Sequence, residues 1–214
     1  MHAKLLISGL LCIAALAVVM IPFLWPLAQQ FSVMAHEGAH ALVGSIMGST
    51  VEGVRLEIES TGGTTWAVAS EGVRRTLTRF VGYLGPSGFG LWAAKLIETG
   101  HIVTVLWIAV IFLVLLLFVI RKSFGMVSVP AAIAALALVM RYAHSGVEEV
   151  IIYGMTWLLL LSGVRVAVAR GTDAADAQNL SDTTHIPRLI WSLLWIAGTV
   201  LAVIIGGKWL VLRS

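Results

Sequence analysis

Long apolar runs separated by short polar segments dominate the pattern of this chain. A membrane-spanning helix needs about 20 consecutive, mostly apolar residues. Runs of this kind recur along the sequence and predict an all-α polytopic membrane protein with six or seven transmembrane helices, of which we favour seven. The predicted spans are residues 5–25, 29–48, 77–97, 101–120, 126–143, 147–166 and 188–206.

The polar segment between the second and third predicted spans has a different pattern. Residues 54–58 alternate between apolar and polar positions, a glycine pair follows at Gly62 and Gly63, and residues 64–68 resume an extended pattern. This order predicts a short β-hairpin with its turn at the glycines. Because open strand edges do not face lipid, we expect the hairpin at the membrane interface or in a cavity lined by protein. A plain connection without a further role is the alternative.

Composition supports a membrane protein and excludes several other classes. The chain of 214 residues is 59% hydrophobic and 12% charged, far from the usual soluble mixture. The net charge is +3, and the chain contains no run of basic residues long enough for a nucleic-acid surface. A single cysteine, Cys12, excludes an intrachain disulfide and a cysteine metal cluster.

The basic residues predict an orientation in the cell membrane, the plasma or inner membrane. The first apolar run is longer than the core of a signal peptide, so we interpret it as a retained span. With seven alternating spans and a cytoplasmic N-terminus, most basic residues fall on the cytoplasmic side, as the positive-inside rule requires. They are Lys4, Arg55, Arg74, Arg75, Arg79, Arg121, Lys122, Arg165, Arg170 and Arg188.

The second predicted span carries the sequence HEGAH, with His36, Glu37 and His40 in an otherwise apolar run. This is the H-E-x-x-H signature of a zinc-binding helix. Residues four apart lie on one helical face, so both imidazoles can reach one metal ion, and Glu37 can act as a general base. Ionisable groups inside a span are costly and indicate function. The alternative is a polar trio that only hydrogen-bonds neighbouring helices.

A catalytic zinc site uses three protein ligands and leaves one position open, so a third ligand must come from elsewhere. Asp176 and Asp173 lie in the polar segment 170–188, which we expect to be a loop. His144 and Glu148, four residues apart, are the other candidates, near the opposite membrane surface. For the two aspartates, a solvated, helix-capping role is the alternative.

Three further stretches strengthen a family resemblance. The order of HEGAH, STGGTTWA, GYLGPSGFG at residues 82–90 and DAQNLSDTTHIPRLIW at residues 176–191 resembles the site-2 protease family of intramembrane zinc metalloproteases, in particular its compact bacterial branch without a PDZ domain. The resemblance covers most of residues 30–195. The family's aspartate ligand commonly stands in an L-D-G motif, which this chain lacks.

The resemblance implies a Zn²⁺ site with His36, His40 and Asp176 as metal ligands and Glu37 as the catalytic base. It also implies regulated intramembrane proteolysis of a membrane-protein substrate with a transmembrane segment. We expect one metalloprotease domain over residues 1–214, with an N-terminal span at 1–28, a catalytic core at 29–195 and the end of the last span and tail at 196–214. The implied substrate contacts are Thr64, Thr65 and Trp66 of the hairpin and Gly85 and Pro86 of the third span.

Two other functions remain open from the residues alone. A zinc or proton transporter would use the same His and Glu cluster as a transient ion site, with His144, Glu148 and Glu149 as a second station. A catalytically inactive membrane scaffold would keep the fold without the reaction. The intact Glu37 argues against the scaffold, and the missing L-D-G motif favours it.

Overall fold

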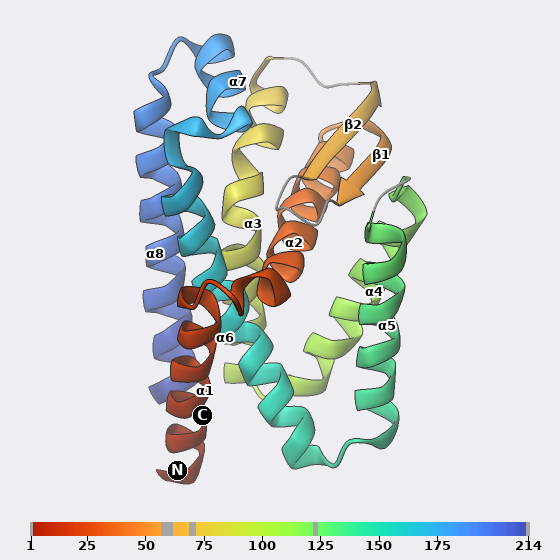
Figure 1. Ribbon diagram of the computed structural model, residues 1–214, viewed down its shortest axis with the longest axis vertical. Coiled ribbons are helices and arrows are strands. Elements are labelled where there is room, and N and C mark those ends of the chain that lie inside the picture. Colours follow the sequence, from red (N-terminus) through yellow and green to blue (C-terminus); the bar gives the residue numbers. More distant parts are fainter. Residues whose placement is uncertain (1, 57–61, 69–71, 122–123, 213–214) are drawn as a thin grey trace.

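The computed structural model describes residues 2–56, 62–68, 72–121 and 124–212, and most of these residues are helical. Figure 1 shows the elements as a helical bundle with two short strands at one end. They are α1 (His2–Met20), α2 (Trp25–Ile46), β1 (Thr50–Leu56), β2 (Gly62–Val68), α3 (Gly72–Glu98), α4 (Ile102–Val119), α5 (Gly125–Tyr142), α6 (Ser145–Arg170), the 3₁₀ turn η1 (Gly171–Asp173), α7 (Ala175–Thr184) and α8 (Arg188–Leu212).

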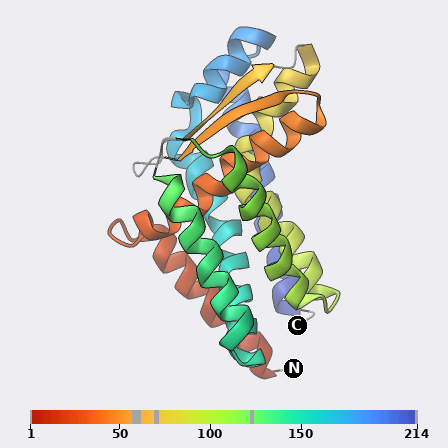
Figure 2. The same cartoon turned by 90° about the vertical axis from the view of Figure 1, so that its right-hand side faces the viewer.

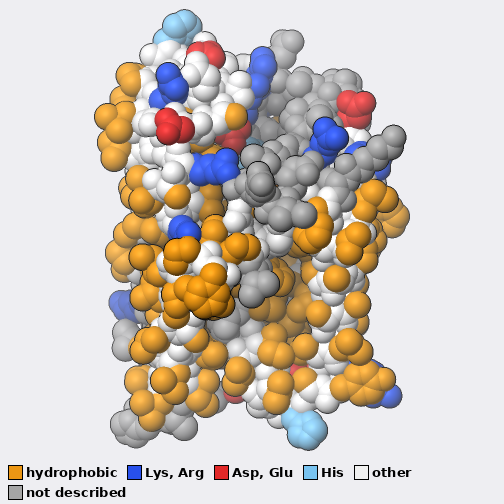
Figure 3. Space-filling model, in the orientation of Figure 1, with side chains coloured by type: hydrophobic (Ala, Val, Ile, Leu, Met, Phe, Trp, Pro, Cys, Tyr) orange, Lys and Arg blue, Asp and Glu red, His pale blue; other side chains and the backbone are white. Residues whose placement is uncertain are grey.

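Four helical segments are long and apolar enough to cross a membrane. Within the described residues they are Ile102–Val119, Gly125–Tyr142, Ser145–Asp173 and Arg188–Val211, and the apolar part of α1, Leu5–Met20, is shorter. Figure 3 shows apolar side chains over most of one face, while charged side chains gather at the end that carries α7 and the strands. These features identify a membrane protein, and the predicted count of six or seven spans stays a prediction.

The first two helices run in the same direction, which differs from the predicted alternation of residues 5–25 and 29–48. Figures 1 and 2 show α1 rising from the N-terminus and α2 continuing towards the strands. The two prolines Pro22 and Pro26 interrupt the helix here, and the short connection redirects the chain without reversing it. Both termini lie at the end opposite α7. Arg74, Arg75 and Arg79, at the start of α3, lie at the other end, which we call the arginine-rich end. The N-terminus and these arginines therefore do not share one end of the bundle, as the predicted seven spans required.

Close contacts at glycine join α3 to its neighbours in the centre of the bundle. A Cβ on Gly85 would press against Ala39 and the backbone of Ala35 in α2, and one on Gly90 would press against Leu160 in α6. Small residues allow helix backbones to approach in this way. The contacts hold the face of α2 that carries Glu37 and His40 inside the protein.

The strands β1 and β2 pair antiparallel beside the end of α2. Leu56 pairs with Gly62 and Arg55 with Gly63, so both glycines belong to β2, and the predicted turn at this pair is wrong. An apolar–polar alternation cannot locate a turn when glycines also fit within a strand. The residues that connect the strands, 57–61, which include the predicted strand residue Ile58, lie outside the described part of the chain.

The predicted loop at residues 170–188 contains a helix, α7, which folds back onto the bundle. Ala177 and Leu180, three residues apart, form a buried apolar stripe on this otherwise polar helix. The stripe belongs to a buried cluster with Tyr83 of α3 and Trp191 and Trp195 of α8. This cluster holds the first turn of α7 against α3.

Candidate metal centre

The helix α2 presents the predicted motif inside the bundle. Glu37 and His40 are buried, with relative exposures of 4% and 7%, and His36 is partly buried. His36 and His40 are one turn apart, and their Nε2 atoms lie 3.2 Å from each other. Both imidazoles therefore point at the same space, as the i and i+4 spacing predicts.

Asp176 completes a cluster of three donor atoms. Its Oδ2 lies 3.3 Å from Nε2 of His40 and 3.5 Å from Nε2 of His36. An ion with tetrahedral geometry and bonds of about 2.0–2.1 Å keeps its ligand atoms about 3.3 Å apart. Two imidazole nitrogens and one carboxylate oxygen at this spacing fit a metal ion, and these are the residues of the described chain that can hold one.

The position of Asp176 in the first turn of α7 explains how a residue distant in sequence reaches the histidines. The buried cluster around Ala177 and Leu180 fixes this turn against α3. Burial of the Asp176 carboxyl disfavours its charged form, but hydrogen bonds with His36 and His40 outweigh that effect and hold its pKa below the usual range. The carboxyl is therefore ionised at neutral pH, as a metal ligand must be.

The other candidates for the third ligand lie elsewhere. Asp173 is exposed on η1, and it is not part of the cluster. His144 is exposed just before α6, and Glu148 lies in the first turn of that helix, at the end of the bundle opposite α7. The structure brings only Asp176 among these four residues to the histidines.

A backbone group that sequence reasoning missed orients His40. Its Nδ1 lies 2.7 Å from the carbonyl oxygen of Thr78 in α3, so the Nδ1–H can donate to this oxygen. This bond turns Nε2 towards His36 and Asp176, and outer hydrogen bonds of this kind fix the ring of a ligating histidine. Because the acceptor is a main-chain carbonyl, the side-chain type at Thr78 carries no signal for it.

Gly82 gives the two imidazoles their room. A Cβ at this position would overlap the ring of His40 and press on His36. In the sequence, Gly82 stands out only as the first residue of GYLGPSGFG. The close approach to the rings of His40 and His36 explains why a glycine stands here.

Two aromatic residues, Tyr83 and Trp195, support the ring of His36. The ring of Tyr83 meets the His36 imidazole edge to face, with centroids 4.7 Å apart, and stacks on Trp195 of α8 at 4.3 Å. The indole N–H of Trp195 donates to the carbonyl of Phe80 at 2.8 Å. Sequence reasoning missed Tyr83 and Trp195, although Tyr83 stands inside the GYLGPSGFG stretch.

The predicted substrate contacts lie in two different elements. Gly85 and Pro86 are buried within α3, one turn after Gly82, where Gly85 contacts α2. Thr64, Thr65 and Trp66 lie in β2, and their side chains are outside the described part of the structure. A substrate role for these residues stays a prediction.

The comparisons with known proteins agree with this geometry. The Peptidase M50B-like family matches residues 9–206. The chain therefore belongs to this family, and so to the site-2 protease family, which points to a protease of the membrane. The comparisons with curated proteins and with solved structures found no match.

Proposed function

We propose that the chain is an intramembrane zinc endopeptidase that hydrolyses peptide bonds in or beside transmembrane segments of other membrane proteins. The observation that carries this proposal is the spacing of 3.2–3.5 Å among the donor atoms of His36, His40 and Asp176. Two imidazoles and a carboxylate suit zinc and leave a fourth position for the reaction. Membership of a peptidase family supports the same conclusion.

Glu37 is the proposed general base. A zinc ion bound by the three ligands would polarise the scissile carbonyl and lower the pKa of a water molecule towards neutrality. Glu37, adjacent to His36 and buried, accepts the proton that water loses as its oxygen bonds to the carbonyl carbon. The same carboxyl delivers a proton to the amine nitrogen as the carbon–nitrogen bond breaks. One water is consumed, and a carboxylic acid and an amine are formed.

The outer edge of β2 is the proposed place for an unwound substrate strand. The opposite edge of this two-stranded sheet is formed by β1. Among the described residues, the segment after α4 already occupies it, because the amide of Arg121 donates to the carbonyl of Val54 at 2.9 Å. Extended peptides add to open strand edges through main-chain hydrogen bonds, which suits a protease with few side-chain requirements. A substrate helix must unwind first, because its own carbonyls are already hydrogen-bonded.

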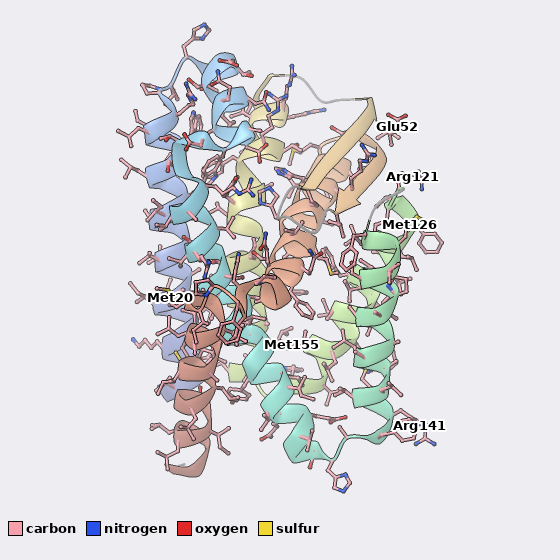
Figure 4. The ribbon with its side chains drawn as sticks, viewed as in Figure 1. Met20, Glu52, Arg121, Met126, Arg141 and Met155 are labelled. Atoms are coloured by element: carbon pink, nitrogen blue, oxygen red, sulfur yellow. The ribbon has the colours of Figure 1, made fainter. Side chains whose placement is uncertain are left out.

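We propose a multi-pass arrangement in the plasma or inner membrane with the arginine-rich end in the cytoplasm. Arg74, Arg75 and Arg79 of α3 belong to the end that carries the strands, and Figure 4 shows Arg121 there and Arg141 at the far end. The positive-inside rule assigns the richer end to the cytoplasm. Both termini then lie on the side of the membrane away from the cytoplasm. In this arrangement α1 and α2 together cross the membrane once, and α3, α4, α5, α6 and α8 make the other five of six crossings.

The transporter alternative lacks support from the geometry. It requires a second polar station, and His144, Glu148 and Glu149 were its candidates. Within the described residues these three form no metal-binding group, and they lie at the end of the bundle opposite α7. The scaffold alternative rested on the missing L-D-G motif, and a spacing suited to metal binding at Asp176 weakens it.

Co-expression with tagged single-span membrane proteins tests the proposed activity. Wild type is expected to release a shorter tagged fragment, and Glu37→Gln, which keeps the size of the side chain and removes its basicity, is expected to release none. Metal content of both proteins is measured in parallel, so that loss of the base is separated from loss of the ion. Cleavage by Glu37→Gln at the wild-type rate would overturn the proposal.

A further inference from the structure

A groove lies on the surface of the bundle, and none of the residues of the metal centre lines it. It is a groove of about 530 Å³ between α1, α6 and α8. Ten of its eleven lining residues are apolar, and the remaining one is Arg165 of α6. Figure 4 marks its position by Met20, the last residue of α1, which also lines it. The groove therefore combines an apolar floor with one fixed positive charge.

The charge of Arg165 is only partly compensated by protein. Its guanidinium lies over the ring of Trp25, 4.3 Å from the centroid, and this contact uses none of its N–H donors. In the described part of the chain, no carboxylate lies within ion-pair distance of it. A cation beside apolar groups requires a counter-charge, and a phosphate matches the planar fork of arginine.

The position of Arg165 along α6 suits the headgroup region of a bilayer. It follows the start of α6 by 20 residues, which corresponds to about 30 Å along the helix and so to the thickness of a bilayer core. Trp25 is the aromatic type that anchors helices at the interface. The floor of the groove, made by residues such as Leu16, Leu161 and Val203, extends from Arg165 along apolar helices.

We propose that this groove binds an anionic phospholipid, with an acyl chain along α1, α6 and α8 and the phosphate on Arg165. Charge complementarity favours an anionic over a zwitterionic headgroup. The site is independent of the metal centre, because none of the residues of the metal centre lines the groove. It lies where α1 joins α2, so a lipid there would brace the connection that sets the path of α2.

Native mass spectrometry tests the site. The protein is reconstituted into vesicles of equal amounts of phosphatidylglycerol and phosphatidylcholine, extracted in mild detergent, and its retained lipids are counted. Wild type is expected to retain phosphatidylglycerol in preference, and Arg165→Gln to retain about fivefold less of it. Arg188→Gln is the matched control, since Arg188 is exposed at the arginine-rich end and does not line the groove.

Two further measurements distinguish a phospholipid from the other molecules that could bind in the groove. Val200→Trp, which fills the groove, is expected to lose the lipid while Arg165 is intact, and excess inorganic phosphate is expected to leave the lipid bound. Equal retention of the two lipids by wild type would overturn the proposal, because it would indicate a purely apolar surface for a helix or detergent. Unchanged retention in Arg165→Gln, equal loss in Arg188→Gln, or complete displacement by phosphate would overturn it too.

Discussion

The Oδ2 atom of Asp176 lies 3.3 Å from Nε2 of His40, although 136 residues separate them in the chain. This contact makes Asp176 the third ligand in our account. Asp176→Asn removes the charge of the ligand, so we expect metal affinity to fall by about 100-fold or more. Chelator competition on the purified protein measures the affinity. Asp173→Asn is the control, because this nearby carboxyl is exposed, and an equal loss in that variant would contradict the assignment.

The room that Gly82 leaves for the imidazoles can be tested on its own. Gly82→Ala places a methyl group in the space of the His40 ring, so we expect the variant to fold and to bind little metal. Gly88→Ala, on the same helix, meets nothing within 4 Å and should behave like wild type. Metal content after dialysis measures metal binding, and the circular dichroism of each variant shows whether it has folded. Full metal content in Gly82→Ala would refute the crowding argument.

The ring of Tyr83 should matter more than its hydroxyl. Tyr83→Phe keeps the edge-to-face contact with His36, whereas Tyr83→Leu removes it. We expect metal affinity close to wild type in the first variant and about 10 to 100-fold weaker in the second, the range seen for outer-shell support. Titration with Co²⁺ and its visible spectrum measures both. If Tyr83→Phe alone loses the site, the hydroxyl rather than the ring holds it.

The strands depend on a close contact with α5. Gly125 lies against the buried side chain of Leu56, the last residue of β1. We expect Gly125→Val to cost about 1–3 kcal/mol through overpacking and to loosen β1 before the helices. Hydrogen exchange of the β1 amides reports this loosening. Gly146→Val, at a glycine with nothing within 4 Å, is the matched control and should leave β1 protected.

The local part of the site could be predicted from the sequence because helical spacing fixes it. His36 and His40 are one turn apart in any α-helix, and the structure brings their rings together. Asp176 was reached through a family resemblance, since spacing along the chain cannot show that α7 folds back. The apolar pair Ala177 and Leu180 that causes this docking is too short to stand out in a polar segment.

Other features could not be predicted because they depend on three-dimensional contacts. The carbonyl of Thr78 and the missing side chain of Gly82 act through their positions, which no residue pattern encodes. The direction of α2 was missed because length and apolarity identify a helix without its orientation. Its path follows from packing at residues such as Gly85, which holds the polar motif within the protein.

X-ray absorption at the zinc edge of the metal-loaded Glu37→Gln protein shows whether His36, His40 and Asp176 bind the ion. This variant keeps all three ligands and is expected not to cleave during the measurement. We expect a zinc ion with two imidazole nitrogens and oxygen ligands at about 2.0–2.1 Å, and the loss of one imidazole when His40→Ala is added. A zinc ion with no imidazole ligands, or an unchanged spectrum after His40→Ala, would contradict this assignment.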